Sequence, residues 1–323
     1  MLRKISALVV PTAIAIGIIA YMLFNVKDQL FLALQHITPV YLIVGILICL
    51  SAWWLRGWRY HAILLGLNYR VSVGVSTACV FVSQTANLVV PARLGDLVRV
   101  FILKHEYTTT YSEGVSSLIV ERVFDIVTVA LLGALSLFFV LNAPSWIYTL
   151  VAVPLGAGIV FFLFLRCTGR CSSGNKYLQI LLTMLHEIER ASLSVRALAL
   201  LGSSSIIIWL LDIFVCMAVI LIFQQQIPFA IVVLAVVIGN LVKAVPLTPG
   251  GIGAYELSLA ITFGLAGIAP AFATLIAVIE HLIKNLVTLA GGIVSIYFFG
   301  DWVVPSIKSA LNSKLERRKK SDD

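Results

Sequence analysis

Residues 240–256 read NLVKAVPLTPGGIGAYE, and residues 87–96 read NLVVPARLGD. Both stretches start with Asn-Leu-Val and then place proline and glycine inside apolar sequence. Proline removes a backbone donor and clashes with the preceding turn, and glycine has a low helix propensity, so both residues interrupt a helix. Each stretch therefore predicts an apolar helix that breaks near its middle.

The surrounding sequence has the composition of a membrane protein. Of its 323 residues, 60% are hydrophobic and only 12% are charged, and the mean hydropathy is +1.04. A soluble globular protein has about 25% charged residues. The composition therefore excludes an ordinary soluble domain, a disordered chain and a nucleic-acid-binding module. At about 20 apolar residues per helical crossing, the length allows roughly six to nine crossings.

Six apolar stretches predict full crossings, and the two broken segments lie between them. The predicted crossings are 5–24, 39–55, 115–141, 146–165, 200–223 and 271–299. An amphipathic portion at 177–190 lies within a charged stretch. The basic and aromatic residues 53–61 follow the second crossing, where Trp, Tyr and Arg are typical interfacial anchors. Contact with lipid headgroups is the alternative interpretation of that stretch.

The distribution of positive charge predicts the topology, because cytoplasmic loops hold the Lys and Arg residues. The N-terminus, the stretch after the second crossing, residues 166–196 and the C-terminal tail are basic. Residues 25–38, 142–145 and 224–228 carry one lysine between them. These assignments agree only if each broken segment enters and leaves the membrane on the same side.

We therefore expect an all-α polytopic membrane protein with six full transmembrane helices and two re-entrant helical hairpins, arranged as an inverted repeat. It would be a multi-pass protein of the cytoplasmic (cell) membrane, with both termini in the cytoplasm. Residues 1–306 form one transmembrane domain, with halves at about 1–141 and 142–306, and residues 307–323 form a basic cytoplasmic tail. Each half has three crossings and a hairpin, and an odd number of crossings inverts the second half.

The two halves place similar residues at matching positions. Asn87 and Asn240 each precede a proline and then a glycine, Gly95 in the first half and Gly250 in the second. Downstream, Glu121 and Asp125 parallel Glu280 and Lys284. The two members of each pair are four residues apart, so they share one helical face. Paired Gly/Pro-broken segments in corresponding positions of two halves indicate a transport site.

Two sets of residues near the breaks are candidates for phosphate binding. Gly250, Gly251 and Gly253 precede a short helix, where free backbone N–H groups favour an anion; a tight turn between half-helices is the alternative. Arg93, Asp96 and Arg99 recur every three residues, and arginine binds phosphate oxygens through two parallel hydrogen bonds. A self-satisfied ionic cluster is the alternative for these three. The predicted lipid- or phosphate-binding set is Asn87, Arg93, Asp96, Arg99, Gly250, Gly251 and Gly253.

Charged residues inside the predicted crossings indicate a polar path. A charge at the centre of a span costs at least about 2.5–3.5 kcal/mol and usually faces a partner or water. Mutual pairing for structural reasons is one alternative, coupling of transport to a protonatable Glu or His is another, and Asp212 and Lys243 are expected to pair across spans. The predicted path comprises Glu121, Arg122, Asp125, Asn240, Glu256, Glu280 and Lys284.

The sequence offers little for catalysis. It contains no GxSxG motif, histidine-rich ligand set or cofactor fingerprint, and its five cysteines are poorly spaced for disulfides or zinc. We expect no enzymatic activity, no cofactor and no metal, with an intramembrane transferase as the alternative.

The residues from Asn87 to Arg99, the Glu121-Arg122 pair with Asp125, and the run Pro246 to Glu256 resemble the lysylphosphatidylglycerol synthase transmembrane-region family, also called the flippase-like domain family. The resemblance covers nearly the whole chain, and the Pro-x-x-Pro-Gly-Gly-x-Gly run is its most specific part. Members fused to an aminoacyl-lipid synthase are held to flip aminoacylated phospholipid, and others accompany polyprenyl-linked glycosylation. This sequence ends in a basic tail without a synthase domain, so lysyl transfer is not implied.

The resemblance implies a flippase that moves a phospholipid or a polyprenyl-phosphate-linked lipid between leaflets. Its partners would be anionic membrane lipids, and possible protein partners are a glycosyltransferase or a lipid synthase; no nucleic acid is expected. Two other functions are kept as alternatives: an accessory subunit of a lipid-modifying or glycosylation enzyme, and a secondary transporter of small solutes.

Overall fold

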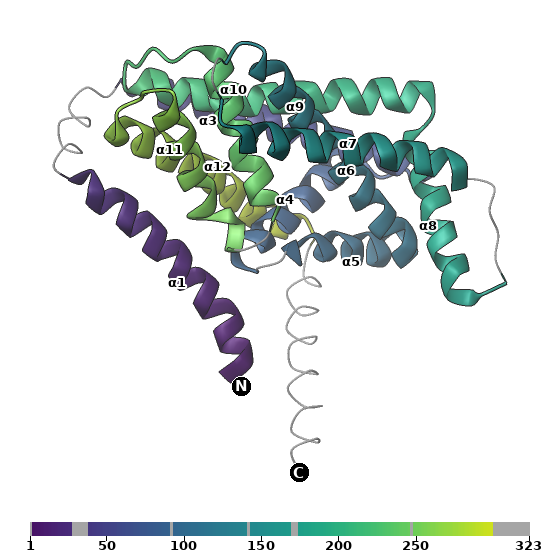
Figure 1. Cartoon of the computed structure of the whole chain (residues 1–323). Helices are drawn as coiled ribbons and strands as arrows, with labels where there is room; N and C mark the ends of the chain where they lie inside the picture. Colours follow the sequence, from purple (N-terminus) through teal and green to yellow (C-terminus); the bar gives the residue numbers. More distant parts are fainter. Residues whose placement is uncertain are drawn as a thin grey trace.

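The computed structural model describes residues 2–27, 38–90, 93–140, 143–168, 174–245 and 248–299. Within these ranges the chain forms eleven α-helices and one short 3₁₀ helix, and no strand. The predicted all-α class is confirmed. Figure 1 shows the helices packed as a bundle, with α1 leaning away at its edge. The predictions for Pro91, Pro246 and the basic tail fall outside the described residues.

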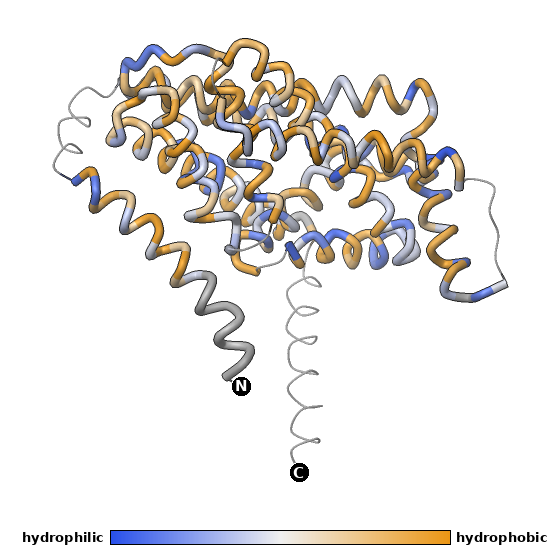
Figure 2. Tube along the Cα trace, in the orientation of Figure 1, coloured by the Kyte–Doolittle hydropathy of each residue, from blue (hydrophilic) through white to orange (hydrophobic). Residues whose placement is uncertain are grey.

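Six helices have the length of a membrane crossing. They are α1 (Leu2–Asn25), α3 (Val40–Gly66), α6 (Tyr111–Leu137), α7 (Ser145–Thr168), α9 (Val195–Ile222) and α12 (Pro270–Phe298). They contain between 24 and 29 residues, which is about 36 Å or more and exceeds the roughly 30 Å hydrocarbon core. By length and composition, α3, α7, α9 and α12 are candidate spans, and Figure 2 shows mostly hydrophobic colouring along these helices. The protein is a polytopic membrane protein.

Helix α6 differs because it carries Glu121, Arg122 and Asp125 close to its middle. Its N-terminus is fixed by a capping box, in which the Thr110 hydroxyl accepts from the Glu113 N–H while the Glu113 carboxylate accepts from the Thr110 N–H. This reciprocal pair satisfies two of the N–H groups that a helix start leaves free. The charged residues lower the hydropathy of α6; Glu121 and Asp125 are buried, and Arg122 is partly exposed.

The two predicted breaks are present. In the first segment α4 (Val73–Val89) is followed by α5 (Asp96–Tyr107), and in the second α10 (Phe229–Ala244) is followed by η2 (Pro249–Gly251) and α11 (Ala254–Leu265). Val90 and Val245, the residues after α4 and α10, are extended, with ψ values of 122° and 110°. Each precedes a proline in the sequence, and proline excludes the helical conformation from the residue before it. In both segments the two helices pack against each other.

Small residues allow α4 to lie deep between α3 and α12. A Cβ atom on Gly57 of α3 would lie 1.9 Å from Thr77 Oγ1, and one on Gly292 of α12 would lie 1.9 Å from Thr85 Oγ1. Membrane helices use such residues for close backbone approach, because the lipid supplies no hydrophobic force between helices. Helix α4 of the first broken segment is therefore held closely between these two helices.

The amphipathic portion predicted at 177–190 is α8 (Lys176–Ser192), which runs across the end of α7 and α9 in Figure 1. The interfacial position predicted for residues 53–61 is wrong. Helix α3 continues to Gly66, and Arg59 is fully buried although Trp54 of the same stretch is exposed. The physical reason is that carboxylates on α6 face Arg59 inside the bundle.

Candidate functional site

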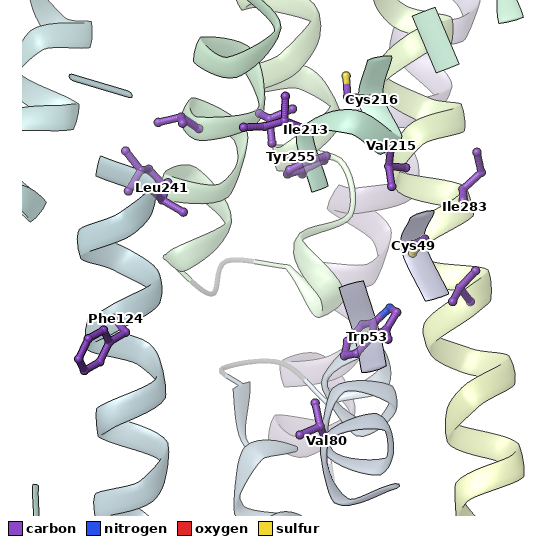
Figure 3. Close-up of a cluster of buried hydrophobic side chains, with 14 of the residues drawn as sticks. Cys49, Trp53, Val80, Phe124, Ile213, Val215, Cys216, Leu241, Tyr255 and Ile283 are labelled. Carbon is purple, nitrogen blue, oxygen red and sulfur yellow. The ribbon is translucent and has the colours of Figure 1, made fainter. Parts of the chain in front are cut away.

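A cavity of about 140 Å³ lies where the two broken segments meet. It is lined from α3, α4, α6, α9, α10, α11 and α12 and from the segments that follow α4 and α10. Its acidic lining residues are Glu121, Asp125 and Asp212. Its basic lining residues are Arg56, Arg93, Arg122, Lys243 and Lys284. Cys49, Trp53, Val80 and Tyr255, which Figure 3 shows among the buried side chains of the core, also contribute to the wall.

Nine of the fourteen predicted site residues line this cavity. They are Asn87, Arg93, Glu121, Arg122, Asp125, Asn240, Gly250, Gly251 and Lys284. The other five do not line it and form the layer behind its wall or beside the turn. These are Asp96, Arg99, Gly253, Glu256 and Glu280.

The first ionic cluster joins α3, α5 and α6 and consists of Arg59, Asp96, Arg99, Glu121, Arg122 and Asp125. The Arg99 guanidinium is fully buried and bonds the Glu121 carboxylate, while its Nη2 donates to Ser83 Oγ at 2.9 Å. Arg59 Nη1 lies 2.7 Å from Asp125 Oδ1, and Arg59 Nη2 lies 3.5 Å from Glu121 Oε1. The predicted phosphate ligand Arg99 is therefore already engaged within the protein.

Asp96 begins α5 and connects it to α4 and α6. Its carboxylate accepts from Asn87 Nδ2 at 2.9 Å and pairs with Arg122 Nη2 at 2.9 Å. The predicted common helical face of Arg93, Asp96 and Arg99 is wrong for Arg93, because the helix starts only at Asp96. Arg93 lies before it in the left-handed region, with φ 53°.

The second ionic cluster joins α3, α9, α10, α11 and α12 and consists of Arg56, Asp212, Lys243, Glu256, Glu280, His281 and Lys284. Lys284 pairs with Glu280 four residues before it, as predicted for one helical face. Asp212 Oδ2 lies 2.8 Å from Arg56 Nη2 and 3.8 Å from Lys284 Nζ. The predicted pairing of Asp212 with Lys243 is therefore wrong, because nearer cations on α3 and α12 take that carboxylate.

Lys243 instead belongs to a chain of polar contacts that runs through His281. Lys243 Nζ lies 2.9 Å from His281 Nε2, and His281 Nδ1 lies 2.7 Å from Glu256 Oε1. The other Glu256 oxygen accepts from the Gly253 N–H at 2.7 Å. This chain connects the cavity wall to the start of α11.

The glycine turn presents fewer free N–H groups than the sequence suggested, because two of the three are engaged within the protein. The N–H of Gly251 donates to the Thr248 carbonyl at 3.1 Å, and the N–H of Gly253 donates to Glu256. The positive φ angles, 62° at Gly250 and 76° at Gly251, let the backbone pass close to neighbouring elements. A Cβ on Gly251 would lie 2.6 Å from Lys243 Cγ, so the turn positions Lys243 by contact.

Arg93 and Lys243 are the two cavity cations without an acidic partner. No carboxylate of the described residues lies within 4.0 Å of either one. Arg93 Nη2 approaches the Lys243 carbonyl at 3.5 Å, so the two come from opposite halves and meet at one point. The buried hydroxyl of Thr248, which also lines the cavity, has no hydrogen-bond partner among the described residues. The site therefore offers two cations and a hydroxyl to an anion.

Sequence reasoning missed Arg56 and Arg59, which it assigned to the membrane surface. The signal was their spacing of three residues, which puts two cations on one face of an otherwise apolar helix. Arg56 also lies between two aromatic rings, 5.0 Å from the ring centre of Trp53 and 5.9 Å from that of Trp209. Arg56 thus makes a cation–π contact with each of the two tryptophans.

Comparison with known proteins gives a family and several relatives. The family described as lysylphosphatidylglycerol synthase TM region matches residues 8–292. Glycosyltransferase AglD of Haloferax volcanii is 31% identical over 301 residues, which cover 79% of this chain and 48% of that protein. UPF0104 membrane protein MJ1078 of Methanocaldococcus jannaschii is 27% identical over 217 residues, 65% of this chain and 92% of that protein.

A UPF0104 membrane protein of Methanothermobacter thermautotrophicus is 22% identical over 312 residues, 88% of this chain and 91% of that protein. The chain thus spans about half the length of AglD and nearly the full length of the two UPF0104 proteins. No solved structure matches.

Proposed function

Because this chain belongs to the lysylphosphatidylglycerol synthase TM region family, we propose that it is a lipid translocase of the cell membrane. Its substrate is an anionic lipid, either a phospholipid or a polyprenyl-phosphate-linked lipid, which it moves between leaflets without chemical change. The observation that carries the proposal is the meeting of Arg93 and Lys243, two cations without an acidic partner, at one cavity between the broken segments.

A lipid phosphate fits this site on charge and on geometry. Arginine presents a planar fork to phosphate oxygens and lysine presents a point charge. Cations at membrane depth normally face a partner or water, and a bound phosphate gives both cations that partner. The left-handed backbone of Arg93 supports a functional role, because such conformations cost about 1–3 kcal/mol and cluster at ligand sites.

The proposed topology has six crossings, α1, α3, α6, α7, α9 and α12, and two re-entrant hairpins, α4–α5 and α10–α11, related as an inverted repeat. The packing supports this arrangement. Helix α4 packs on α12 as α10 packs on α6, α5 packs on α6 as α11 packs on α12, and the equivalent α3 and α9 pack on each other. Positive charge in the connecting segments supports the proposed cytoplasmic location of both termini.

The positions at which α5 and α11 begin show which residues of the two halves are equivalent. Gly95 precedes α5 and Gly253 precedes α11, and both helices contain 12 residues. Gly95 is thus equivalent to Gly253. In the sequence it matched Gly250 instead, because Gly95 and Gly250 lie at the same distance after a proline. The second half carries three extra residues at its break, and they form the turn that contacts Lys243.

The test is a leaflet-exposure assay in proteoliposomes containing fluorescent phosphatidylglycerol or a fluorescent polyprenyl phosphate. We expect wild-type protein to speed the exchange of one of these lipids, and Arg93→Gln to slow it at least tenfold. The matched control is Arg166→Gln, the same change at an exposed arginine outside the cavity, which should exchange lipid like the wild type. Exchange no faster than in empty liposomes for both lipids contradicts the proposal.

A second candidate, an accessory subunit of a glycosylation enzyme, is favoured by the match to about half of a protein named glycosyltransferase AglD. In this function the chain would hold a separate glycosyltransferase or lipid synthase and deliver its lipid. Purification of the chain from its own membranes should then recover such an enzyme in constant proportion. Recovery of the chain alone, with full exchange activity, contradicts this candidate.

A further inference from the structure

The two hairpins are joined to the bundle by different chemistry. In the first half, Arg99 on α5 bonds Glu121 on α6, and in the second half Glu256 on α11 bonds His281 on α12. Arginine stays protonated in proteins, whereas histidine and buried lysine exchange protons. Among the described residues, the second half thus links its hairpin through a titratable base, whereas the base in the first-half link, Arg99, keeps its proton.

The His281 ring uses both of its nitrogens and is fully buried. Nδ1 faces Glu256 Oε1 at 2.7 Å, and Nε2 faces Lys243 Nζ at 2.9 Å. A neutral imidazole has one donor and one acceptor, so Nδ1–H donates to the carboxylate and Nε2 accepts from lysine. A neutral lysine amine also has hydrogens to donate. Lys243 can therefore lose one proton without breaking the chain.

The charged and titratable groups around Lys243 and His281 come from three helices and one connecting segment. They are Arg93 between α4 and α5, Asp212 on α9, Tyr255 and Glu256 on α11, and Glu280 and Lys284 on α12. Lys284 is paired with Glu280 and lies near Asp212, and Glu256 is bonded to His281. Arg93 is the neighbour of Lys243 whose charge no carboxylate offsets.

We propose that the cavity takes up one proton together with each phosphate-bearing headgroup, and that Lys243 holds this proton. The inference rests on the proposed lipid site. In the empty cavity, Arg93 repels positive charge on Lys243, and at low dielectric this favours the neutral amine. A phosphate monoanion between the two cations reverses the balance and favours the ammonium form.

The proton comes from water on the side to which the cavity is open, and binds the Lys243 amine to form the ammonium. It leaves from Lys243 to water when the headgroup departs on the other side. The lipid anion and the proton thus cross together, and the pair carries no net charge. The membrane potential, which acts on every transported charge, then neither drives nor opposes the exchange.

Calorimetry on the purified full chain in detergent tests this inference. Dioctanoyl-phosphatidylglycerol is titrated at about pH 8 in two buffers of different ionisation enthalpy, and the difference in heat gives the protons taken up per bound lipid. We expect about one proton. A parallel titration with a farnesyl phosphodiester, which like phosphatidylglycerol carries one negative charge at this pH, distinguishes a phospholipid from a polyprenyl-phosphate-linked lipid as the source of the phosphate. Dioctanoylglycerol, which lacks phosphate, should not bind.

Two variants separate proton uptake from lipid binding. Lys243→Arg keeps a cation that does not titrate, and Lys243→Gln removes the titrating amine but keeps a polar side chain. Both should bind phosphate lipid with proton uptake near zero, whereas Lys104→Arg, at an exposed lysine of α5, should match the wild type. If Lys243→Arg does not fold, Lys243→Gln decides.

The outcomes separate the two proposals. Wild-type binding of a phosphate lipid without proton uptake overturns the proton inference and leaves the lipid site intact. If both variants take up as many protons per bound lipid as the wild type, the proton inference is also overturned. No phosphate-dependent binding of either lipid overturns the lipid site, and the proton inference with it.

Discussion

Replacing Glu121 by glutamine tests the first ionic cluster most directly. The cluster has three arginines and three carboxylates, and Glu121 contacts Arg99 and Arg59, both fully buried. Glutamine keeps the shape of the side chain but removes its charge, which leaves one buried guanidinium uncompensated. Breaking a buried ion pair in this way costs about 3–5 kcal/mol. Because two arginines lose a partner, we expect a loss of about 4–5 kcal/mol.

The free energy of unfolding can be measured by titrating the purified protein from mild detergent into mixed micelles with sodium dodecyl sulfate. The matched control is Glu106→Gln, the same change at an exposed position of α5, which should stay within about 0.5 kcal/mol of the wild type. Adding Arg99→Met to Glu121→Gln removes the surplus charge, so the double variant should regain about 2 kcal/mol. A Glu121→Gln protein within about 1 kcal/mol of the wild type, or a double variant no more stable than the single one, refutes the reasoning.

Three further predictions concern packing, capping and the ligand site. Gly57→Ala should cost about 1–3 kcal/mol of unfolding free energy, because its Cβ would lie 1.9 Å from Thr77 Oγ1; a Gly57→Ala, Thr77→Ala double variant that recovers nothing would contradict this contact. Thr110→Ala should cost about 1 kcal/mol by breaking the α6 capping box, and an unchanged melting temperature would count against that role. Thr248→Val should leave the melting temperature unchanged, since its hydroxyl has no partner among the described residues, but weaken phosphate-lipid binding about tenfold in calorimetry; equal affinity would exclude the hydroxyl from the site.

Much of the fold follows from one-dimensional features of the sequence. Apolar length locates the six long helices, and the two breaks follow from Pro91 and Pro246, which force the preceding valines out of the helical region. These features are local, so the sequence carries them without any tertiary contact. The second predicted crossing ended too early because a run of Trp, Arg and Tyr looks the same at a membrane surface and at a buried polar junction. Only the position of Asp125 relative to Arg59 distinguishes the two.

The sequence predicts which charged residues belong to the candidate site, but not which of them pair with one another. Intramembrane charges are rare enough that Glu121, Arg122 and Asp125 mark the site by their presence alone. Which cation pairs with which acid depends on how helices far apart in sequence rotate against each other. The sequence therefore suggested Asp212 with Lys243, whereas the packing of α3 on α9 brings Arg56 to Asp212. The same packing leaves Lys243 to His281.

Charge balance supports the proposed selectivity of the cavity for an anion. The first cluster pairs Arg59, Arg99 and Arg122 with three carboxylates. The second contains as many cations as carboxylates: Arg56, Lys243 and Lys284 against Asp212, Glu256 and Glu280, with Lys243 connected to Glu256 only through His281. With His281 counted as neutral, each cluster sums to zero, and Arg93 remains as a single excess cation facing the cavity. At membrane depth such an excess is costly, and two events remove it: loss of one proton from Lys243, or binding of one negative charge. The empty cavity with neutral Lys243 and the occupied cavity with protonated Lys243 are then both electrically neutral. In this proposal a headgroup with a single negative charge therefore enters together with one proton at little electrostatic cost.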